Sequence, residues 1–214
     1  MKDNRNYRYK LNENSFRAEY GIISGWIPAN SNVLDLGCGD GSLLKLLGGK
    51  GIKGEGIDIS PTGIKSARKK GIRATVGRID TKLKYKKGYF DFAICNVTLQ
   101  MVLYPEILLD EMARVSKQQI ISFPNFAFIN NRIELFLDGR MPMRMFADQK
   151  WYSTGLIHQL SLSDFEKFCQ VRKLKIVNRY FFTIQKFGPI PEIILKMFPK
   201  LFTVTAIYML SGKK

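Results

Sequence analysis

Three glycines at alternate positions, Gly37, Gly39 and Gly41, follow a short apolar segment and precede a segment with helical spacing. Glycine is required where the backbone adopts positive φ, or where a ligand must approach the main chain with no Cβ in its way. A helix that starts directly after such a loop presents unpaired N–H groups, which suit a carboxylate or a phosphate. The pattern therefore predicts a strand, a ligand-binding turn and a helix, an arrangement that is typical of open α/β sheets.

Apolar runs and helical-period stretches alternate along the rest of the chain, as in parallel β-α-β units. The expected strands span residues 32–36, 52–59, 72–76, 90–97, 119–123, 175–183 and 203–210. The expected helices span residues 42–47, 61–70, 105–115, 128–137 and 163–171, the last opening with the capping-box spacing Ser163-Asp164-Phe165-Glu166. A proline-rich stretch separates the last two strands and is too broken for a regular crossover helix, which favours an antiparallel edge strand. We expect a doubly wound, mostly parallel α/β sheet.

Length and composition favour one folded domain over residues 1–214, with a lid at about 138–160, where neither period is clear. The 45% hydrophobic content excludes a disordered chain, and no apolar run reaches the roughly 18 residues of a membrane span. The first residues are basic but lack an apolar stretch behind them, so no secretory signal is expected. Cys38, Cys95 and Cys169 are odd in number and widely spaced. Neither a disulfide framework nor a zinc site is expected, and a cytoplasmic location fits best.

Two acidic residues indicate which ligand the glycine loop suits. Asp58 closes the second expected strand, 21 residues after Gly37, where a carboxylate can accept both hydroxyls of a ribose. Asp35 would repel a pyrophosphate, but it favours a ligand that carries an ammonium and a sulfonium. The dinucleotide fingerprint requires glycine where Ser42 stands, and no Lys-Ser/Thr pair follows as in a P-loop. These features predict S-adenosylmethionine as the ligand; the alternative is that the glycines form only a tight β-α turn.

Together with further motifs, these residues resemble the MetW family of methionine biosynthesis proteins, within the class I S-adenosylmethionine-dependent methyltransferases. The similarity covers about residues 22–180, with a weaker likeness at 198–202, and its generic part is the segment 33–41. Its specific part consists of Thr98-Leu99-Gln100, Ser122-Phe123-Pro124-Asn125, Gly139-Arg140-Met141-Pro142, Trp151-Tyr152 with Thr154, and Ile157-His158 before Asp164-Phe165-Glu166. The resemblance implies a seven-stranded Rossmann-like sheet that binds S-adenosylmethionine, and a link to homoserine O-acyltransferase in methionine synthesis.

The resemblance also implies roles for individual residues. The loop that holds the methionine end of the cofactor corresponds to Asp35, Gly37, Cys38, Gly39 and Gly41. The acid that binds the ribose corresponds to Asp58, and the apolar residue beside the adenine corresponds to Ile59. Asn96 falls where the ligand cleft opens. The adenine edge corresponds to residues 76–80, which include Ile79 and Asp80. Arg78 stands where the family usually has an acid that accepts from the adenine amino group. Asp80 is the expected substitute, with backbone contacts as the alternative.

Two residues are candidates for a part in catalysis. His158 is the chain's only histidine, so it is the sole candidate for an imidazole base; the alternative is that it fixes the lid by a hydrogen bond. Gln100 follows the fourth expected strand, where its side chain would face either the reacting methyl group or solvent. Methyl transfer to a nucleophilic atom depends more on alignment than on a base. Trp151 and Tyr152 would either line an acceptor pocket or anchor the lid.

Sulfur-containing residues are expected to pack rather than react. Cys38 lies at a helix start, which can depress the pKa of a thiol, but a small residue in a crowded turn is the favoured interpretation. Met141, Met143 and Met145 have no histidine or cysteine close by in sequence, so they predict adaptable packing and no metal site.

The formal net charge of +16 concentrates in two segments. Residues 61–90 hold ten Lys or Arg and one acid, and residues 171–214 hold nine and one. These segments are either solvated surface or a docking face for RNA or an acidic protein. The segment Cys95-Asn96-Val97-Thr98 lacks the Pro-Pro motif of base amino-methylation and a Pro-Cys nucleophile, so nucleic acid is not favoured. Three hypotheses remain: a small-molecule methyltransferase of MetW type, a regulatory subunit of homoserine O-acyltransferase, and an RNA methyltransferase.

Overall fold

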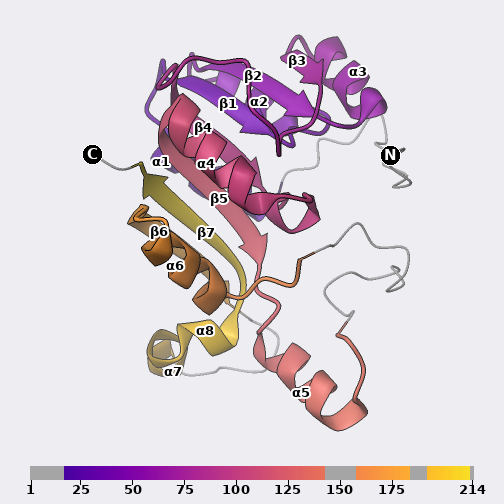
Figure 1. Ribbon diagram of the computed structural model, residues 1–214, viewed down its shortest axis with the longest axis vertical. Helices are drawn as coiled ribbons and strands as arrows, with labels where there is room; N and C mark the ends of the chain where they lie inside the picture. Colours follow the sequence, from indigo (N-terminus) through magenta and orange to yellow (C-terminus); the bar gives the residue numbers. More distant parts are fainter. Residues whose placement is uncertain (1–16, 143–157, 184–191, 213–214) are drawn as a thin grey trace.

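The computed structural model describes residues 17–142, 158–183 and 192–212, which form a seven-stranded sheet flanked by helices (Figure 1). The strands are β1 (Asn32–Leu36), β2 (Lys53–Asp58), β3 (Arg73–Val76), β4 (Phe90–Asn96), β5 (Ser116–Pro124), β6 (Lys175–Thr183) and β7 (Thr203–Ser211). The helices are α1 (Ala18–Trp26), α2 (Ser42–Gly48), α3 (Pro61–Lys69), the 3-10 helix η1 (Leu99–Met101), α4 (Pro105–Val115), α5 (Ile129–Asp138), α6 (Leu162–Val171), α7 (Glu192–Met197) and α8 (Pro199–Phe202). The predicted α/β class is confirmed.

The strands are ordered β3-β2-β1-β4-β5-β7-β6, and β1 to β5 pair in parallel. β7 is antiparallel to both of its neighbours, β5 and β6. The sequence predicts the antiparallel strand at the edge, whereas the structure places it one position inside, with β6 at the edge. The reason lies in the side chains: the continuous apolar run 206–210 is buried, as an inner strand requires, while most of β6 is exposed.

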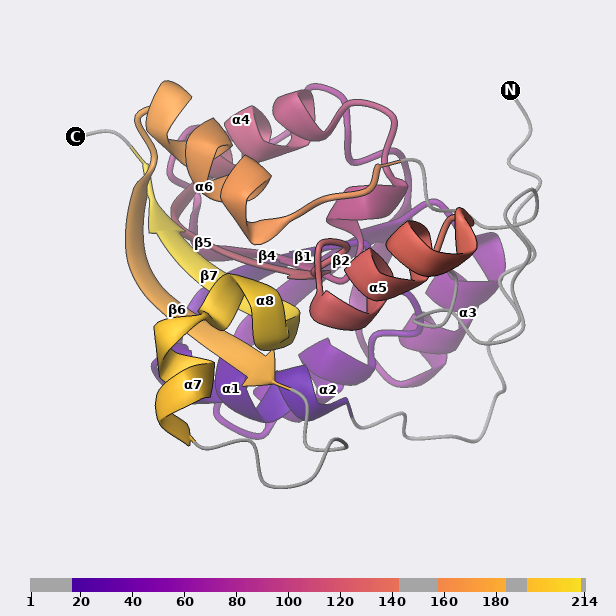
Figure 2. The same ribbon diagram turned by 90° about the horizontal axis from the view of Figure 1, so that it is seen from below.

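Helices cover both faces of the sheet, as the doubly wound prediction requires. Figure 2 shows α4 and α6 on one face and α1, α2 and α3 on the other. One apolar core under the first pair includes Leu108, Met112 and Phe165, and the opposite core includes Ile23 and Leu47. Burial on two faces explains why several strands are nearly continuous apolar runs.

Helix α6 begins earlier than the sequence predicts. Its N-cap is Ser161, whose Oγ accepts a hydrogen bond from the Asp164 N–H, and the Asp164 carboxylate accepts from the Ser161 N–H. This reciprocal pair is a capping box, so the predicted box at Ser163 is wrong by two residues. In the observed box, aspartate takes the N3 position, where glutamate or glutamine is usual, whereas Ser163 and Glu166 have the usual spacing.

Two helical regions were not predicted. Helix α1 contains Gly21 and Gly25, which weaken its helical pattern, and the short helices α7 and α8 lie within the proline-rich stretch. The spacing of Tyr20, Ile23 and Ile27, which are all buried, is the signal that would have identified α1.

The described helices and the three cysteines bear on two further predictions from the sequence. Among the described residues, no helix combines the length and apolar composition needed to cross a membrane. Cys38, Cys95 and Cys169 are buried and free, and burial raises the pKa of Cys169 to about 12. Buried thiols of this kind pack as small apolar groups.

Candidate functional site

A cavity of about 410 Å³ opens at the carboxyl ends of β1, β2 and β4. The strand order reverses between β1 and β4, and such switch points are where open α/β sheets bind ligands. Most of the predicted cofactor residues line this cavity: Asp35, Gly37, Cys38, Gly39, Asp58, Ile59, Ile79, Asp80 and Asn96. Gly41 lies just outside the lining, at the N-cap of α2. The fold thus brings the predicted residues together, while their part in binding remains a prediction.

The glycine loop is compact because side chains have no room there. Gly37 has φ +85°, and a Cβ on it would lie 2.6 Å from Thr98 Oγ1 and Cγ2. Gly41 has φ +73°, and a Cβ there would lie 2.9 Å from the Cβ of Ala67. The N–H groups of Gly37 and Cys38 both donate to the Ile57 carbonyl, at 2.8 and 3.2 Å. Neighbouring elements therefore demand glycine at these positions whether or not a ligand is bound.

Replacing Gly37 with alanine is expected to lower the free energy of unfolding by roughly 2–4 kcal/mol, through the left-handed φ and the clash with Thr98. Gly25→Ala is the matched control, because a Cβ there meets nothing within 4 Å and alanine favours the helix. We expect the control to stabilise the protein by about 0.5–1 kcal/mol. Urea unfolding of both variants measures the effect. Equal stability of the two variants would refute this account of the loop.

Asp58 ties the loop to the cavity. Its Oδ2 accepts a hydrogen bond from the Gly39 N–H at 2.8 Å, and its Oδ1 accepts from the Ser60 N–H at 2.7 Å. The first bond crosses from β2 to the glycine loop, so one buried carboxylate sets the loop's position and lines the cavity. Its location at the end of β2 is the one that the sequence predicts.

Asp35 is a buried acidic residue in the cavity wall. The residue is 2% exposed, and within the described part of the chain its Oδ1 has no hydrogen-bond partner. Burial, followed by repulsion from Asp58, raises the pKa of Asp35 to about 7, against a smaller lowering by Arg17. A buried polar atom without a partner costs free energy, so the arrangement favours a ligand that brings a cation or a donor.

The pKa of the Cys38 thiol is raised, whereas that of an activated thiol is lowered. Burial, and then the nearby Asp35 and Asp58 carboxylates, raise the pKa of Cys38 well above its usual value. This direction argues against the alternative of a thiol with depressed pKa and agrees with the favoured interpretation of a packing residue. A Cβ on Gly56 would lie 2.5 Å from the Cys38 Sγ, so this side chain fills the crowded space between the glycine loop and β2.

The opposite end of the cavity carries an ion pair. The Arg78 guanidinium donates from Nε and Nη2 to the two carboxylate oxygens of Asp80, at 3.1 and 2.9 Å. The Leu103 N–H also donates to Asp80, at 3.1 Å. Arg78 is thus held against Asp80 rather than standing alone at the predicted adenine edge.

The turn after β4 contains an uncommon backbone conformation. Val97, which lines the cavity, has φ +50°, a value that β-branched residues rarely adopt. Its N–H donates to the carbonyl and Oγ of Ser122, at 3.0 and 2.9 Å, and its carbonyl accepts from Gln100 Nε2 at 3.1 Å. Strain held in place by its surroundings concentrates at functional sites, and this turn lies on the cavity wall beside Asn96.

The two catalytic candidates lie beside each other but do not line the cavity. The His158 N–H donates to the Gln100 carbonyl at 3.1 Å, so His158 lies next to η1. Gln100 Oε1 and His158 Nε2 are buried, and neither has a hydrogen-bond partner within the described ranges. Trp151, Tyr152, Met143, Met145 and most of the predicted lid lie outside the described residues.

Sequence reasoning missed several residues that line the cavity. Arg17 and Tyr20 come from the start of α1, and Met101, Val102 and Leu103 come from η1 and the loop after it. Burial raises the pKa of Tyr20 to about 12, so its hydroxyl stays protonated. Arg17 places a guanidinium in a cavity whose other charged residues are mostly acidic.

The family described as methionine biosynthesis protein MetW matches residues 17–210. The chain belongs to the MetW family. A MetW-containing relative, the bifunctional methionine biosynthesis protein MetXA/MetW of Rhodopirellula baltica, is 35% identical over 126 residues, which are 54% of this chain. The match spans only 20% of that relative's length.

Solved structures share the fold of this MetW-family chain. A chain in the complex between the Haloferax volcanii Trm112 methyltransferase activator and a putative methyltransferase aligns with a TM-score of 0.67 at 16% identity, over 91% of this chain and 88% of that one. An S-adenosylmethionine-dependent methyltransferase from Mesorhizobium loti aligns with a TM-score of 0.66 at 16% identity, over 93% of this chain and 100% of that one. Magnesium protoporphyrin IX methyltransferase from Synechocystis, with bound SAH, aligns with a TM-score of 0.61 at 17% identity, over 91% of this chain and 80% of that one. The class I methyltransferase fold is confirmed.

Proposed function

We propose that this MetW-family protein binds S-adenosylmethionine in the cavity and transfers its methyl group to a small-molecule acceptor in methionine biosynthesis. The observation that carries the proposal is the Asp35 carboxylate, which is buried in the cavity wall with no partner for Oδ1 among the described residues. The ammonium of the cofactor's amino-acid end would be that partner.

The other cavity residues fit the remaining parts of this cofactor. The Arg17 guanidinium would bind the α-carboxylate, and the Asp58 carboxylate would accept from the ribose hydroxyls. The glycine loop would let the ligand approach the main chain. Ile59 and Leu103 would offer apolar contacts to the faces of the adenine ring. Side chains suited to the amino-acid end, the ribose and the adenine ring thus line one cavity, which supports the proposal.

Bound there, S-adenosylmethionine would supply a methyl group on a positively charged sulfur. The protein's contribution would be to align an acceptor and exclude water, which together account for much of the rate in such reactions. Gln100 and His158 are our candidates for orienting the acceptor. Both residues lie next to the cavity but outside its lining, and within the described ranges their buried Oε1 and Nε2 atoms have no hydrogen-bond partner, which supports that role because buried polar atoms usually have partners.

A second candidate function is regulatory: the chain would bind homoserine O-acyltransferase and use S-adenosylmethionine as a signal. The name of the R. baltica relative, which joins MetXA and MetW in one protein, favours this candidate. It predicts that the chain co-purifies with the acyltransferase and changes its rate. Absence of both a complex and a rate effect, with and without S-adenosylmethionine, would reject it.

Calorimetric titration of the full chain with S-adenosylmethionine and S-adenosylhomocysteine tests the main proposal. We expect saturable binding at one site per chain for both compounds. Asp110→Asn serves as a neutral control, because this residue is about half exposed and pairs with Arg172 away from the cavity lining. No binding of either compound would overturn the proposal. Binding without methyl transfer to any candidate acceptor would favour the regulatory function.

A further inference from the structure

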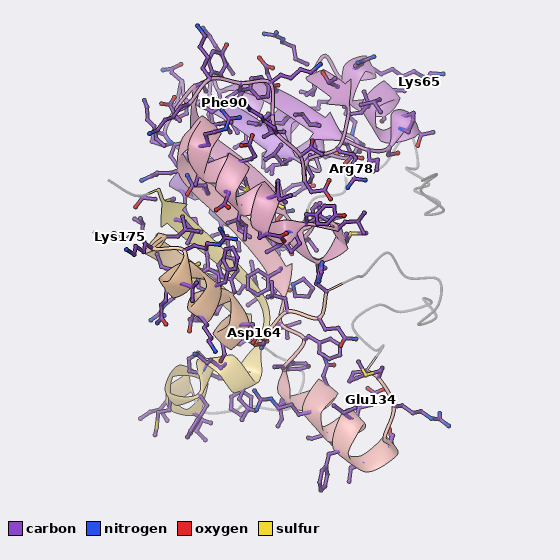
Figure 3. All side chains as sticks on the ribbon, in the orientation of Figure 1. Lys65, Arg78, Phe90, Glu134, Asp164 and Lys175 are labelled. Atoms are coloured by element: carbon purple, nitrogen blue, oxygen red, sulfur yellow. The ribbon has the colours of Figure 1, made fainter. Side chains whose placement is uncertain are left out.

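The polar residues at the cavity end of the sheet extend beyond β1 onto the next two strands. β4 begins at Phe90 (Figure 3) and ends at Asn96, which lines the cavity. Asn96 pairs with Ser122 of β5 in the parallel register, so both side chains point to the same face of the sheet. Asp35 of β1 pairs with Ile94, two residues before Asn96, and therefore shares that face. A row of polar side chains thus runs from β1 to β5.

The Ser122 hydroxyl determines which way the Asn96 amide faces. Ser122 is fully buried, and its Oγ accepts a hydrogen bond from the Val97 N–H at 2.9 Å and donates one to Asn96 Oδ1 at 2.5 Å. The second distance is in the range for an O–H donor and too short for an N–H donor. The oxygen of the Asn96 amide therefore faces Ser122, and the nitrogen lies on the other side.

The Asn96 amide nitrogen is a hydrogen-bond donor that no described residue uses. An amide nitrogen carries two N–H groups, yet Nδ2 donates to no atom of the described residues. Nδ2 is not sealed from solvent either, because the buried side-chain atoms without a partner in the described ranges do not include it. A donor of fixed orientation in a cavity wall indicates a ligand that supplies an oxygen acceptor.

We propose that Asn96 Nδ2 donates to an uncharged oxygen of the methyl acceptor, a carbonyl or a hydroxyl, and that Ser122 is the positioning residue for this amide. The inference rests on the proposed binding of S-adenosylmethionine. With its ribose at Asp58 and its ammonium at Asp35, the cofactor would extend over the ends of β2 and β1. β4 is the next strand in the sheet, so Asn96 lies beyond the amino-acid end of the cofactor, where an acceptor would enter.

The charges near Asn96 favour an uncharged oxygen over a carboxylate. The amide is neutral, and the Asp35 side chain on the same face of the neighbouring strand would repel an anion. Arg17 is the cation from α1 in the cavity lining, and the α-carboxylate of the proposed cofactor would occupy it. A carbonyl or hydroxyl oxygen accepts from the amide without adding negative charge. The acceptor is therefore a small molecule with an uncharged oxygen beside the atom that receives the methyl group.

The experiment follows the full chain by proton–nitrogen correlation NMR, first with S-adenosylhomocysteine and then with two probes of similar shape, acetone and acetate. Loss of signals in Asn96→Asp identifies the Asn96 side-chain amide. With S-adenosylhomocysteine at saturation, acetone should shift this amide saturably. The backbone signals of Val97 and Thr98 report the affinity of each probe, and we expect acetone to bind at least about threefold more tightly than acetate.

Variants separate the donor from the residue that positions it. Asn96→Asp replaces the donor with an acceptor and should weaken acetone binding by about tenfold. Ser122→Ala frees the amide to rotate and should weaken it by about threefold, whereas Ser122→Thr keeps the hydroxyl and should preserve it. Asn178→Asp is the matched control, because Asn178 is exposed on β6 away from the cavity lining, and it should leave acetone binding unchanged.

Each failure has its own signature. If S-adenosylhomocysteine binds but acetone does not shift the Asn96 amide, or if acetate binds more tightly than acetone, the inference is wrong and the proposed cofactor stands. A shift caused by S-adenosylhomocysteine, with no further change on adding acetone, would assign Asn96 to the cofactor and also overturn it. Equal acetone affinity in wild type and Ser122→Ala would remove the positioning role.

Absence of S-adenosylhomocysteine binding would instead remove the proposed function itself. Melting temperatures check that each variant folds. If the added methyl group of Ser122→Thr prevents folding, Ser122→Ala and Asn96→Asp still decide the outcome.

Discussion

Replacing Asp58 with alanine is expected to weaken S-adenosylmethionine binding by at least about 100-fold. Two charge-assisted hydrogen bonds to the ribose would be lost, each contributing about 1.5–3 kcal/mol, and every 1.4 kcal/mol is about tenfold in affinity. The same change removes the acceptor for the Gly39 and Ser60 N–H groups, at 2.8 and 2.7 Å. Each buried donor left without a partner costs about 1–3 kcal/mol, so the variant should also be less stable.

Asp91→Ala is the matched control for this prediction. Asp91 Oδ2 likewise accepts a backbone hydrogen bond, from the Asn32 N–H at 2.9 Å, but it lies at the start of β4, at the opposite end of the strand from the cavity. We expect the control to lose stability and keep its affinity, while Asp58→Ala loses both. Calorimetry reports affinity and urea unfolding reports stability. Wild-type affinity in Asp58→Ala would exclude this cavity as the cofactor site.

The parallel part of the fold is predictable from the sequence because its local signals agree. The apolar runs that end at Leu36 and Asp58 are followed by glycine or proline at the turn and then by helical spacing. Where a signal is weak, prediction failed: Gly21 and Gly25 obscure α1, and prolines obscure α7 and α8. The inner position of β7 does have a signal in the sequence, the continuous apolar run 206–210, which contrasts with the more polar β6 and which the edge-strand prediction did not use.

The residues of the candidate site also fall into those with a clear local signal in the sequence and those without one. Asp35, Asp58 and the glycines are predictable because they sit at fixed offsets from strand ends, and the carboxyl ends of parallel strands meet at one edge. Arg17 is missed because its helix is missed. The Arg78–Asp80 pair shows a different limit: the sequence indicates two residues at the predicted adenine edge, but the hydrogen bond from the Leu103 N–H comes from a loop more than twenty residues later.

The basic segment 61–90 is less available for partners than its composition indicates. Lys70 pairs with Asp40 of the glycine loop, Arg73 pairs with Glu55, and Arg78 pairs with Asp80. Asp40, Arg78 and Asp80 line the cavity, so two of these three pairs lie at its wall. Docking of RNA or of an acidic protein on the remaining lysines stays a prediction.

Replacing Asp35 with asparagine is expected to raise stability at pH 8 while weakening S-adenosylmethionine binding. Burial and the nearby Asp58 carboxylate raise the pKa of Asp35 from 3.8 to about 7 in the folded protein, although Arg17 opposes the shift. Between these values the folded state binds more protons than the unfolded state, so the free energy of unfolding falls as pH rises. The full cost above pH 7 is roughly 4 kcal/mol, at about 1.4 kcal/mol per pKa unit. Asparagine has nearly the same shape and avoids this cost.

Binding should show the opposite pH dependence, because the cofactor's ammonium requires the ionised carboxylate. Affinity of the wild type should rise by up to about tenfold per unit as pH increases from 5.5 to 7, with proton release, and then level off. Asp35→Asn should bind weakly at all these values, with a flat profile. Calorimetry in buffers of different ionisation enthalpy measures the released protons, and urea unfolding from pH 4 to 8 measures stability. A pH-independent wild-type affinity, or an asparagine variant less stable than wild type at pH 8, would contradict the role of Asp35 as a buried group that ionises for its ligand.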